Sequence, residues 1–379
     1  MTPIAYARHH SDRSLLITVF GLVLFGLVMV YSSSIVIATL PPFADSTFFV
    51  KKQLVAAVIG IILMLIMANI DYRIWKKWAS LMLGITLLLL ISVFFFSSGE
   101  ILGAHRWITV AGQTFQPSEL AKLSFIVYTA AWLVRQEREI KNVRATFIPF
   151  LLVLALISVL MLMEPDFGTL MIIMMPVLAI YYVAGMTFKQ FLILLSVGVI
   201  AGAAVLSTPY RRARVETFIN PTSSTDQSGS SYHINQISIA IGSGGMWGRG
   251  FGKSKQKLLF LPEPYTDSIF AITVEELGAV RSLLLILVLC YLIYRGYRVA
   301  SLSADLFGRL LAIGITTWFA FQAMINLGSM LHLVPLVGVP LPFISYGGSN
   351  LMISLMAIGV LLNVSRYTQT PEAIKQHRR

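Results

Sequence analysis

Acidic side chains beside or inside apolar runs are the groups in this sequence best suited to acid–base chemistry. Asp267 ends the proline-rich turn 261–267 and stands directly before a long apolar run. Because aspartate is a favoured N-cap, its carboxylate could serve only to satisfy backbone amides of the first helical turn. The other interpretation is a general base for a substrate held at the surface of a membrane. A helix N-terminus lowers the pKa of such a carboxyl whereas desolvation raises it, so the two interpretations oppose each other.

Charged residues inside apolar runs form a second group of candidates, because a charge at hydrocarbon depth costs at least about 3 kcal/mol. Glu119 and Lys122 are three residues apart, which places them on one helix face where they can form an ion pair. Glu275 and Glu276 follow the acid at the helix entry by about two turns, so at least one is expected to point toward the same cavity. Arg281 lies deeper still, at an awkward spacing for a direct pair with either glutamate.

Three further segments carry polar groups between apolar runs. Arg106 and Trp107 place a cation beside an aromatic ring, which suits either a binding site or an ordinary aromatic belt at a membrane interface. Asp166 lies in a tight turn and is either a helix cap or a site carboxylate. The segment 333–350, which includes Ser345, is apolar but rich in proline and glycine. Irregular backbone of this kind at membrane depth must be covered by protein or must line a cavity.

Motifs for tightly bound cofactors are missing from the sequence. Its six histidines are scattered, it has one cysteine, Cys290, and it contains no HExxH, Gly-x-Ser-x-Gly or dinucleotide-binding fingerprint. The glycine-rich stretch 242–252 lacks the preceding strand and the Gly-Lys-Ser/Thr ending of a phosphate-binding P-loop. We therefore expect no tightly bound cofactor or metal, with a divalent cation such as Mg²⁺ or Mn²⁺ as the remaining candidate.

The elements that must position these groups are membrane-spanning helices. The 379 residues are 56% hydrophobic and only 12% charged, with a mean hydropathy of +0.78, which excludes a soluble globular protein. The apolar runs are long enough to cross about 30 Å of hydrocarbon. They predict an all-α polytopic membrane protein with about ten transmembrane helices, near residues 14–39, 53–70, 78–97, 118–134, 147–163, 166–184, 188–206, 268–294, 310–328 and 346–364.

Basic residues indicate how the chain is oriented. An even number of spans places both termini on one side, and the Lys and Arg residues of the short loops gather on that side. The short loops of the opposite side hold only Lys51, Lys52 and Arg106, so the positive-inside rule places both termini in the cytoplasm. The expected organisation is a cytoplasmic tail, a transmembrane domain and a second cytoplasmic tail, over residues 1–13, 14–366 and 367–379.

The long extracytoplasmic loop 207–267, between the seventh and eighth runs, departs from this charge pattern. Topology does not require a long translocated loop to be basic, yet this loop contains Arg211, Arg212, Arg214, Arg249, Lys253, Lys255 and Lys257. It is either a solvated loop or a surface that meets an anionic headgroup or a pyrophosphate. Within it, residues 220–230 are rich in turn formers, and the isoleucines of 231–241 predict a short amphipathic helix at the membrane interface.

Five motifs, in order along the chain, resemble the SEDS family (shape, elongation, division and sporulation). They are GAHRWI at 103–108, QPSE at 116–119, PDFGT at 165–169, PEPYTD at 262–267 with EELG at 275–278, and PFISYGGS at 342–349. The basic stretches 209–214 and 252–257 are more similar to the division branch of that family, FtsW, than to its elongation branch, RodA. Ser268, Ile237 and Arg281 depart from the family pattern, which more often has phenylalanine, serine and glycine there.

The resemblance implies a bacterial peptidoglycan glycosyltransferase of the cytoplasmic membrane. Such an enzyme polymerises lipid II at the outer face of that membrane, works with a class B penicillin-binding transpeptidase and other division-complex membrane proteins, and binds no nucleic acid. Asp267 matches the catalytic aspartate of the family. We expect the substrate to contact Arg106, Trp107, Glu119, Lys122, Asp166, Arg212, Lys253, Lys257, Glu275, Glu276 and Ser345.

Three alternatives remain at this stage: a lipid II flippase, an elongation-type polymerase and a non-catalytic scaffold. A flippase needs a polar route through the full depth of the bilayer, whereas the cytoplasmic halves of the expected spans contain few polar groups. A scaffold would not need the carboxylate of Asp267.

Overall fold

The computed structural model describes residues 11–96, 106–110, 113–164, 166–206, 218 and 229–368. In this part the chain forms a helical bundle with one two-stranded antiparallel hairpin. The main elements are α1 (Arg13–Thr39), α2 (Phe48–Asn69), α3 (Arg73–Phe96), β1 (Ile108–Val110), β2 (Gln113–Phe115), α4 (Pro117–Arg135), α5 (Ile148–Met163), α6 (Phe167–Gly185), α7 (Phe188–Leu206), α9 (Ser230–Gly244), α10 (Ile269–Leu302), α11 (Leu306–Met330) and α12 (Gly348–Ser365). Two short helical turns, Glu137–Glu139 and Val143–Phe147, join α4 to α5.

A helix forms at each of the apolar runs identified in the sequence. Eight helices of the described chain are long and apolar enough, by length and composition, to cross a membrane: α1, α2, α3, α5 with the turn before it, α6, α10, α11 and α12. The all-α, polytopic fold class is therefore confirmed, and the chain is a multi-pass membrane protein. Helix α4, which also covers a predicted run, is less apolar because it contains Glu119 and Lys122.

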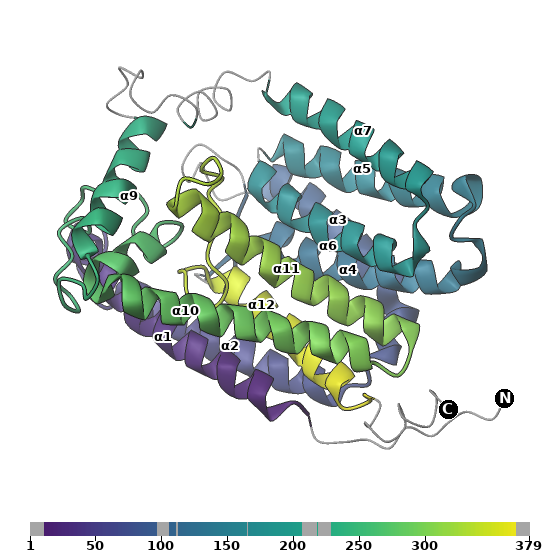
Figure 1. Cartoon of the computed structure of the whole chain (residues 1–379), viewed down its shortest axis with the longest axis horizontal. Helices are drawn as coiled ribbons and strands as arrows, with labels where there is room; N and C mark the ends of the chain where they lie inside the picture. Colours follow the sequence, from purple (N-terminus) through teal and green to yellow (C-terminus); the bar gives the residue numbers. More distant parts are fainter. Residues whose placement is uncertain are drawn as a thin grey trace.

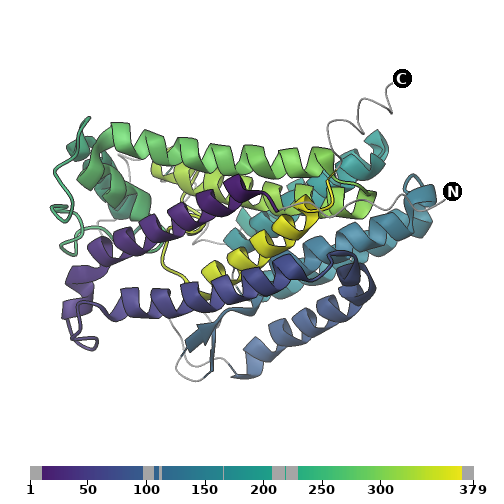
Figure 2. The ribbon, with the colours of Figure 1, turned by 90° about the horizontal axis from the view of Figure 1, so that it is seen from below.

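Helix α12 forms the centre of the bundle, with 89% of its apolar window buried inside the protein. It packs along α2 and also contacts α11 and α4 (Figure 1). The contact with α2 is close, because a Cβ on Gly359 would lie only 2.4 Å from the backbone oxygen of Met64. Figure 2 shows α1, α2 and α12 running side by side below α10, the arrangement that surrounds α12 with protein.

The first helix and the last helix meet at one end of the bundle. Asp12 caps α1 by accepting a hydrogen bond from the Leu15 amide at 3.1 Å, and its own amide donates to Ser365 Oγ at 3.0 Å. The Asp12 carboxylate also pairs with Arg295 near the end of α10. These contacts place the start of α1 and the end of α12 on the same side, as an even number of crossings requires.

The proline-rich segment between α11 and α12 is covered by protein, one of the two outcomes expected for it. Leu341, Phe343 and Ile344 are buried. The backbone of this segment is held by side chains of neighbouring helices: Asn326 Nδ2 donates to the Val339 oxygen at 2.7 Å, and Gln53 Nε2 donates to the Ser345 oxygen at 3.2 Å. An irregular chain can therefore lie inside the bundle without unsatisfied backbone groups at these positions.

Helix α9 is the short amphipathic helix predicted at 231–241, and it is slightly longer than expected. It lies across one end of the bundle, at the left of Figure 1. Its apolar residues Ile234, Ile237 and Ala240 are buried, and it packs on α10 and α11, so its apolar face points to protein. The predicted helix is confirmed, and its apolar surface is used for tertiary packing.

Candidate active site

Asp267 lies just before the start of α10, but it does not occupy the N-cap position. The helix begins at Ile269 with Ser268 as its N-cap, so the N-cap interpretation of Asp267 is wrong. Asp267 is partly exposed, whereas Ser268 is completely buried and lies 2.8 Å from His233 Nε2 of α9. The backbone oxygen of Asp267 accepts a hydrogen bond from Asn326 Nδ2 at 2.9 Å. The backbone of Asp267 is thus held by Asn326, and Asp267 stands one position before the N-cap residue.

The segment between α11 and α12 forms one wall beside this carboxylate. A Cβ on Gly338 would lie 3.1 Å from Asp267 Oδ2, and Gly338 has a φ of +74°. Two reasons favour glycine at position 338. A side chain would crowd the carboxylate, and residues other than glycine rarely adopt a backbone with this positive φ. On the other side of the same segment, a Cβ on Gly168 at the start of α6 would lie 3.1 Å from the Val337 oxygen. The outer ends of α6 and α10 therefore meet this segment from two sides.

Two tyrosines and a phenylalanine pack together at the turn that ends at Asp267. The Tyr265 ring lies 4.5 Å from that of Phe49 and 5.6 Å from that of Tyr346, and the Tyr346 amide donates to the Tyr265 oxygen at 2.9 Å. Burial raises the pKa of the Tyr265 hydroxyl well above its usual range, with smaller contributions from Glu263 and Tyr346. The hydroxyl therefore stays protonated and can donate a hydrogen bond. Sequence reasoning missed both tyrosines, although Tyr265 lies only two residues before the aspartate.

The turn between α5 and α6 brings Arg106 and Asp166 together. Asp166 caps α6 by accepting from the Thr169 amide at 3.2 Å, and its second oxygen accepts from Gln116 Nε2 at 3.0 Å. Arg106 Nε donates to the backbone oxygen of Glu164 at 2.9 Å. The helix-cap interpretation of Asp166 is confirmed, and the same carboxylate ties the start of α4 to the start of α6.

Glu164 in this turn is a buried acid that sequence reasoning did not single out. It is 1% exposed, and neither carboxyl oxygen has a hydrogen-bond partner among the residues that the structure describes. Desolvation raises the pKa of this carboxyl to about 8; the charge of Asp166 acts in the same direction and Arg106 opposes it. Glu164 is therefore protonated near neutral pH, which is how an acid without hydrogen bonds can remain buried.

The ion pair expected between Glu119 and Lys122 is present. Lys122 Nζ lies 2.5 Å from Glu119 Oε2, and both side chains are buried. Asn350 Nδ2 of α12 also donates to Glu119 at 2.8 Å, and the Lys122 ammonium lies 4.8 Å from the ring centroid of Trp318 in α11. The pair therefore joins α4 to α11 and α12, and its predicted role in substrate binding stays a prediction.

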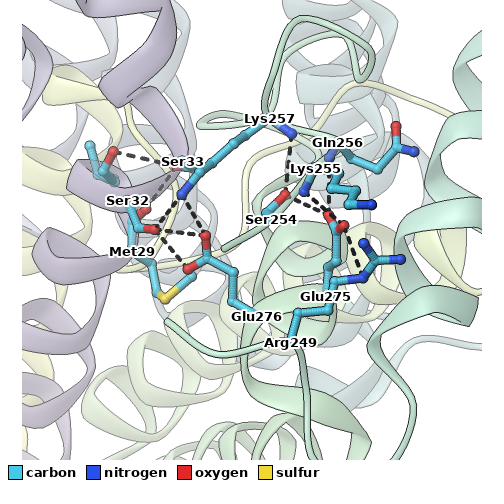
Figure 3. A network of polar contacts seen from close by, with 11 residues as sticks. Met29, Ser32, Ser33, Arg249, Ser254, Lys255, Gln256, Lys257, Glu275 and Glu276 are labelled. Atoms are coloured by element: carbon cyan, nitrogen blue, oxygen red, sulfur yellow. Dashed lines mark hydrogen bonds and ion pairs between the residues drawn. The ribbon is translucent and has the colours of Figure 1, made fainter. Parts of the chain in front are cut away.

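Glu275 and Glu276 hold the loop that precedes the active-site turn (Figure 3). Glu275 accepts from Ser254 Oγ at 2.5 Å and from the Lys255 amide at 2.9 Å, and it lies 3.7 Å from Arg249 Nε. Figure 3 shows this carboxylate directed at the loop residues.

The neighbouring Glu276 connects the loop to α1. Its carboxylate accepts from Lys257 Nζ at 2.8 Å and from Ser32 Oγ at 2.8 and 2.7 Å. Lys257 is 4% exposed, so this basic loop residue is buried in an ion pair. The described contacts of Glu276 and Lys257 are structural, and their predicted contacts with substrate stay predictions.

Helix α10 is interrupted at Gly278, which has φ +85° and ψ 169°. The Glu275 and Glu276 carbonyl oxygens near this kink accept the amides of Arg249 and Gly250 at 2.9 and 3.0 Å. The loop and the kink fit tightly, because a Cβ on Gly278 would lie 2.4 Å from the Gly248 nitrogen.

The kink also accounts for Arg281, which had no explanation in the sequence. Its Nη1 donates to the Leu277 oxygen at 3.3 Å and to the Trp247 oxygen at 3.1 Å. The guanidinium therefore binds carbonyl groups of the kink and of the loop packed on it.

The remaining predicted residues fall in three groups. Ser345 is buried, and its hydroxyl accepts from the Leu341 amide at 2.8 Å, so it stabilises the turn before α12. Lys253 is exposed on the loop, and Trp107 is half-buried before β1. Arg211, Arg212 and Arg214 lie outside the described residues. Within the described residues, no group of three or more His, Cys, Asp or Glu converges as a metal site would require.

This arrangement defines a multi-pass helical membrane protein with a polar, partly aromatic site at the end of the bundle remote from the start of α1. The chain belongs to the cell cycle protein family of FtsW, RodA and SpoVE, whose profile matches residues 12–370. The expected SEDS membership is thus confirmed.

Individual relatives match almost the whole chain. It is 41% identical over 360 residues to stage V sporulation protein E of Bacillus subtilis, covering 94% of this chain and 98% of that protein. It is 38% identical over 359 residues to the probable peptidoglycan glycosyltransferase FtsW of Trichlorobacter lovleyi, covering 93% of each. A solved structure described as coordinating polymerization and crosslinking in a peptidoglycan synthase complex superposes with a TM-score of 0.76 at 26% identity, covering 94% of this chain and 98% of that one.

Proposed function

We propose that this protein is a peptidoglycan glycosyltransferase that polymerises lipid II at the outer face of the cytoplasmic membrane. Relatives that cover more than nine tenths of the chain carry the name peptidoglycan glycosyltransferase. The observation that carries the proposal is Asp267, a partly exposed carboxylate that precedes the helix cap, lies beside Gly338 and follows Tyr265, whose ring packs on Tyr346. A carboxylate that only capped the helix would not need that surrounding.

In the proposed reaction Asp267 is the general base. Its carboxylate takes the proton from the 4-hydroxyl of the acceptor sugar, and the hydroxyl oxygen attacks the anomeric carbon of the donor chain. The new glycosidic bond forms as the bond from that carbon to the pyrophosphate oxygen breaks, so undecaprenyl pyrophosphate leaves with the electron pair. A single displacement inverts the anomeric centre, so an α-linked donor gives a β-linked polymer.

Cationic groups near the site stabilise the departing pyrophosphate. Arg106, just before β1, donates to the Glu164 oxygen in the α5–α6 turn, and Lys253 is exposed on the loop before Asp267. Positive groups placed where negative charge develops lower the barrier of such a reaction. A divalent cation remains an expectation, and the steps described above need none.

The proposal extends to the setting of the reaction. We place both termini in the cytoplasm and the site outside, at the division septum. A class B penicillin-binding transpeptidase and other division-complex membrane proteins are the partners. The similarity to a peptidoglycan synthase complex supports a penicillin-binding partner.

Polymerisation of lipid II by the purified protein with its transpeptidase partner tests the catalytic assignment. Loss of a general base costs about 100-fold to 10,000-fold in rate, so Asp267→Ala and Asp267→Asn should each lose at least about 100-fold. Asp45→Asn is the matched control, because Asp45 is a carboxylate in the α1–α2 loop that pairs with Lys51 outside the site. Polymer of equal yield from Asp267→Ala would reject the assignment.

Transport is tested separately with liposomes that contain labelled lipid II. The glycosyltransferase should give no translocation when it is reconstituted alone. Translocation without polymer, unaffected by Asp267→Ala, would favour a flippase.

A further inference from the structure

The segment Gly245–Leu261, called here the outer loop, exposes an unusual amount of apolar surface for a segment outside the helices. Large apolar patches on a protein surface mark contact with another apolar phase. The exposed side chains and their exposed fractions are Met246 63%, Trp247 69%, Phe251 51%, Leu258 51%, Leu259 59% and Phe260 52%.

These side chains are presented by a fixed scaffold. Below them, Glu275 and Glu276 bind Ser254, Lys255 and Lys257, as Figure 3 shows. The outer loop is also bonded to the α10 backbone on both sides of the kink, for example from the Ala279 amide to the Gly245 oxygen at 2.9 Å. Such contacts hold the exposed residues at a constant height relative to α1 and α10.

The length of α1 gives that height. Ser32, which binds Glu276 and Lys257, lies 19 residues from Arg13 at the far end of α1, or about 29 Å at 1.5 Å per residue. This distance is close to the thickness of the hydrocarbon layer, about 30 Å. The outer loop therefore lies at the boundary between hydrocarbon and headgroups.

The apolar surface of the outer loop continues the lipid-facing side of α10. Directly below the kink, α10 exposes Val280, Leu283, Leu284 and Leu287, each between 40% and 61%. These residues lie in a helix that is long and apolar enough to span a membrane, and the described part of the chain leaves them exposed. The contact from Arg281 to Trp247 joins that surface to the outer loop.

The charges of the outer loop also suit a position at the boundary between hydrocarbon and headgroups. The segment 245–261 contains no acidic residue, and Arg249, Lys253 and Lys255 are exposed. Basic residues at this height meet the phosphates of anionic lipids, and tryptophan prefers the interface.

We propose that the outer loop is a membrane anchor that inserts its apolar side chains into the outer leaflet and binds anionic phospholipid headgroups through Arg249, Lys253 and Lys255. Because Asp267 lies only six residues after the end of the outer loop, the anchor fixes the height of that carboxylate above the bilayer. This inference does not depend on the reaction that the site performs.

Spin labelling in nanodiscs tests the anchor directly, because Cys290 is the one native cysteine and Cys290→Ser removes it. Labels are placed by Trp247→Cys and Leu259→Cys in separate proteins. Leu284→Cys, on the lipid-facing side of α10, is the lipid reference, and Ala44→Cys, in the exposed α1–α2 loop, is the water reference.

The measured quantity is the ratio of oxygen accessibility to accessibility for a water-soluble nickel reagent. We expect Trp247→Cys and Leu259→Cys to give ratios close to that of Leu284→Cys and well above that of Ala44→Cys, with no other protein present. Ratios equal to that of Ala44→Cys would overturn the proposal. Labels that are exposed to water alone and become protected only when a transpeptidase is added would assign the surface to a protein partner.

A second comparison isolates the headgroups. Nanodiscs of phosphatidylglycerol should hold the Trp247→Cys label deeper than nanodiscs of phosphatidylcholine. Lys253→Gln with Lys255→Gln should remove most of that difference. Equal depth in the two lipids for the otherwise native loop would overturn the headgroup part of the proposal.

Discussion

Replacing Lys257 with methionine removes the cation that neutralises Glu276 while keeping an unbranched apolar stem of similar length. The Lys257–Glu276 pair has an N–O distance of 2.8 Å, and the two side chains are only 5% and 0% exposed. Breaking a buried ion pair from one side costs about 3–5 kcal/mol, because the remaining charge is left in a medium that solvates it poorly. Ser32 still donates to Glu276 in the variant, so we expect the lower end, about 3 kcal/mol, or about 100-fold in the unfolding equilibrium.

Unfolding of Lys257→Met, Glu276→Gln and the double variant, followed by denaturant titration in detergent, measures the coupling between the two residues. The double variant should be less destabilised than the sum of the single variants, since removing both partners leaves no uncompensated charge. The control is the Lys51–Asp45 pair, which has the same N–O distance of 2.8 Å but side chains that are 67% and 39% exposed. Its double-variant cycle should show no resolvable coupling, because solvent screens an exposed pair.

The same variants have a consequence for activity. Loosening the outer loop from α10 changes the geometry of the turn that ends at Asp267, so polymerisation by Lys257→Met should fall more than its folded fraction does. The double variant should recover part of the loss. Additive unfolding energies in the buried cycle, or a Lys257→Met protein as stable as the parent, would refute the view that this pair holds the outer loop.

Three further changes give expected outcomes. Gly278→Ala forces a Cβ to 2.4 Å from the Gly248 nitrogen at a φ of +85°, so a lowered unfolding temperature is expected, whereas Gly21→Ala, with no atom within 4 Å, should leave it unchanged or raise it. Gly338→Ala places a Cβ 3.1 Å from Asp267 Oδ2 at a φ of +74°, so the carboxylate must shift by a few tenths of an ångström, and kcat should fall with KM less affected. Because burial raises the pKa of Glu164 from 4.5 to about 8, the folded state retains a proton that the unfolded chain loses, so stability falls as pH rises through that window. Glu164→Gln should flatten this decline, and an unchanged slope would show that the acid is not neutral in the fold.

The apolar runs predicted the helices well, because the thickness of the membrane sets both the length of an apolar run and the length of the helix that it forms. The run 14–39 corresponds to Arg13–Thr39, and the run 147–163 corresponds to Ile148–Met163. The prediction was poorest for α10, which was expected to end near 294 but continues to Leu302. The last residues of this helix include arginines and tyrosines, so the apolar pattern stops before the helix does.

Local contacts of the site could be predicted, and distant ones could not. The Glu119–Lys122 pair follows from a spacing of three residues on one helix. Glu276 instead finds Ser32, 244 positions away in sequence, and no periodicity contains that information. The interpretation of Asp267 as a cap failed because a one-residue uncertainty in the start of α10 decides which side chain occupies the cap.

The position of the kink explains the role of Glu275 and Glu276, the two buried glutamates that follow Asp267 along the chain. Gly278 divides α10 into an outer part, 269–277, that begins directly after the turn with Asp267, and an inner part long enough to cross the membrane. Without further contacts, the two parts of a helix broken at this point could adopt different angles. The bonds from the outer loop to Glu275 and Glu276 fix that angle. An apolar contact of equal area could stabilise the junction as well, but it would allow several orientations of the outer part. Paired charges and directed hydrogen bonds allow few orientations. We infer that these buried polar groups specify the orientation of the outer part, and with it the direction in which Asp267 approaches a substrate at the membrane surface.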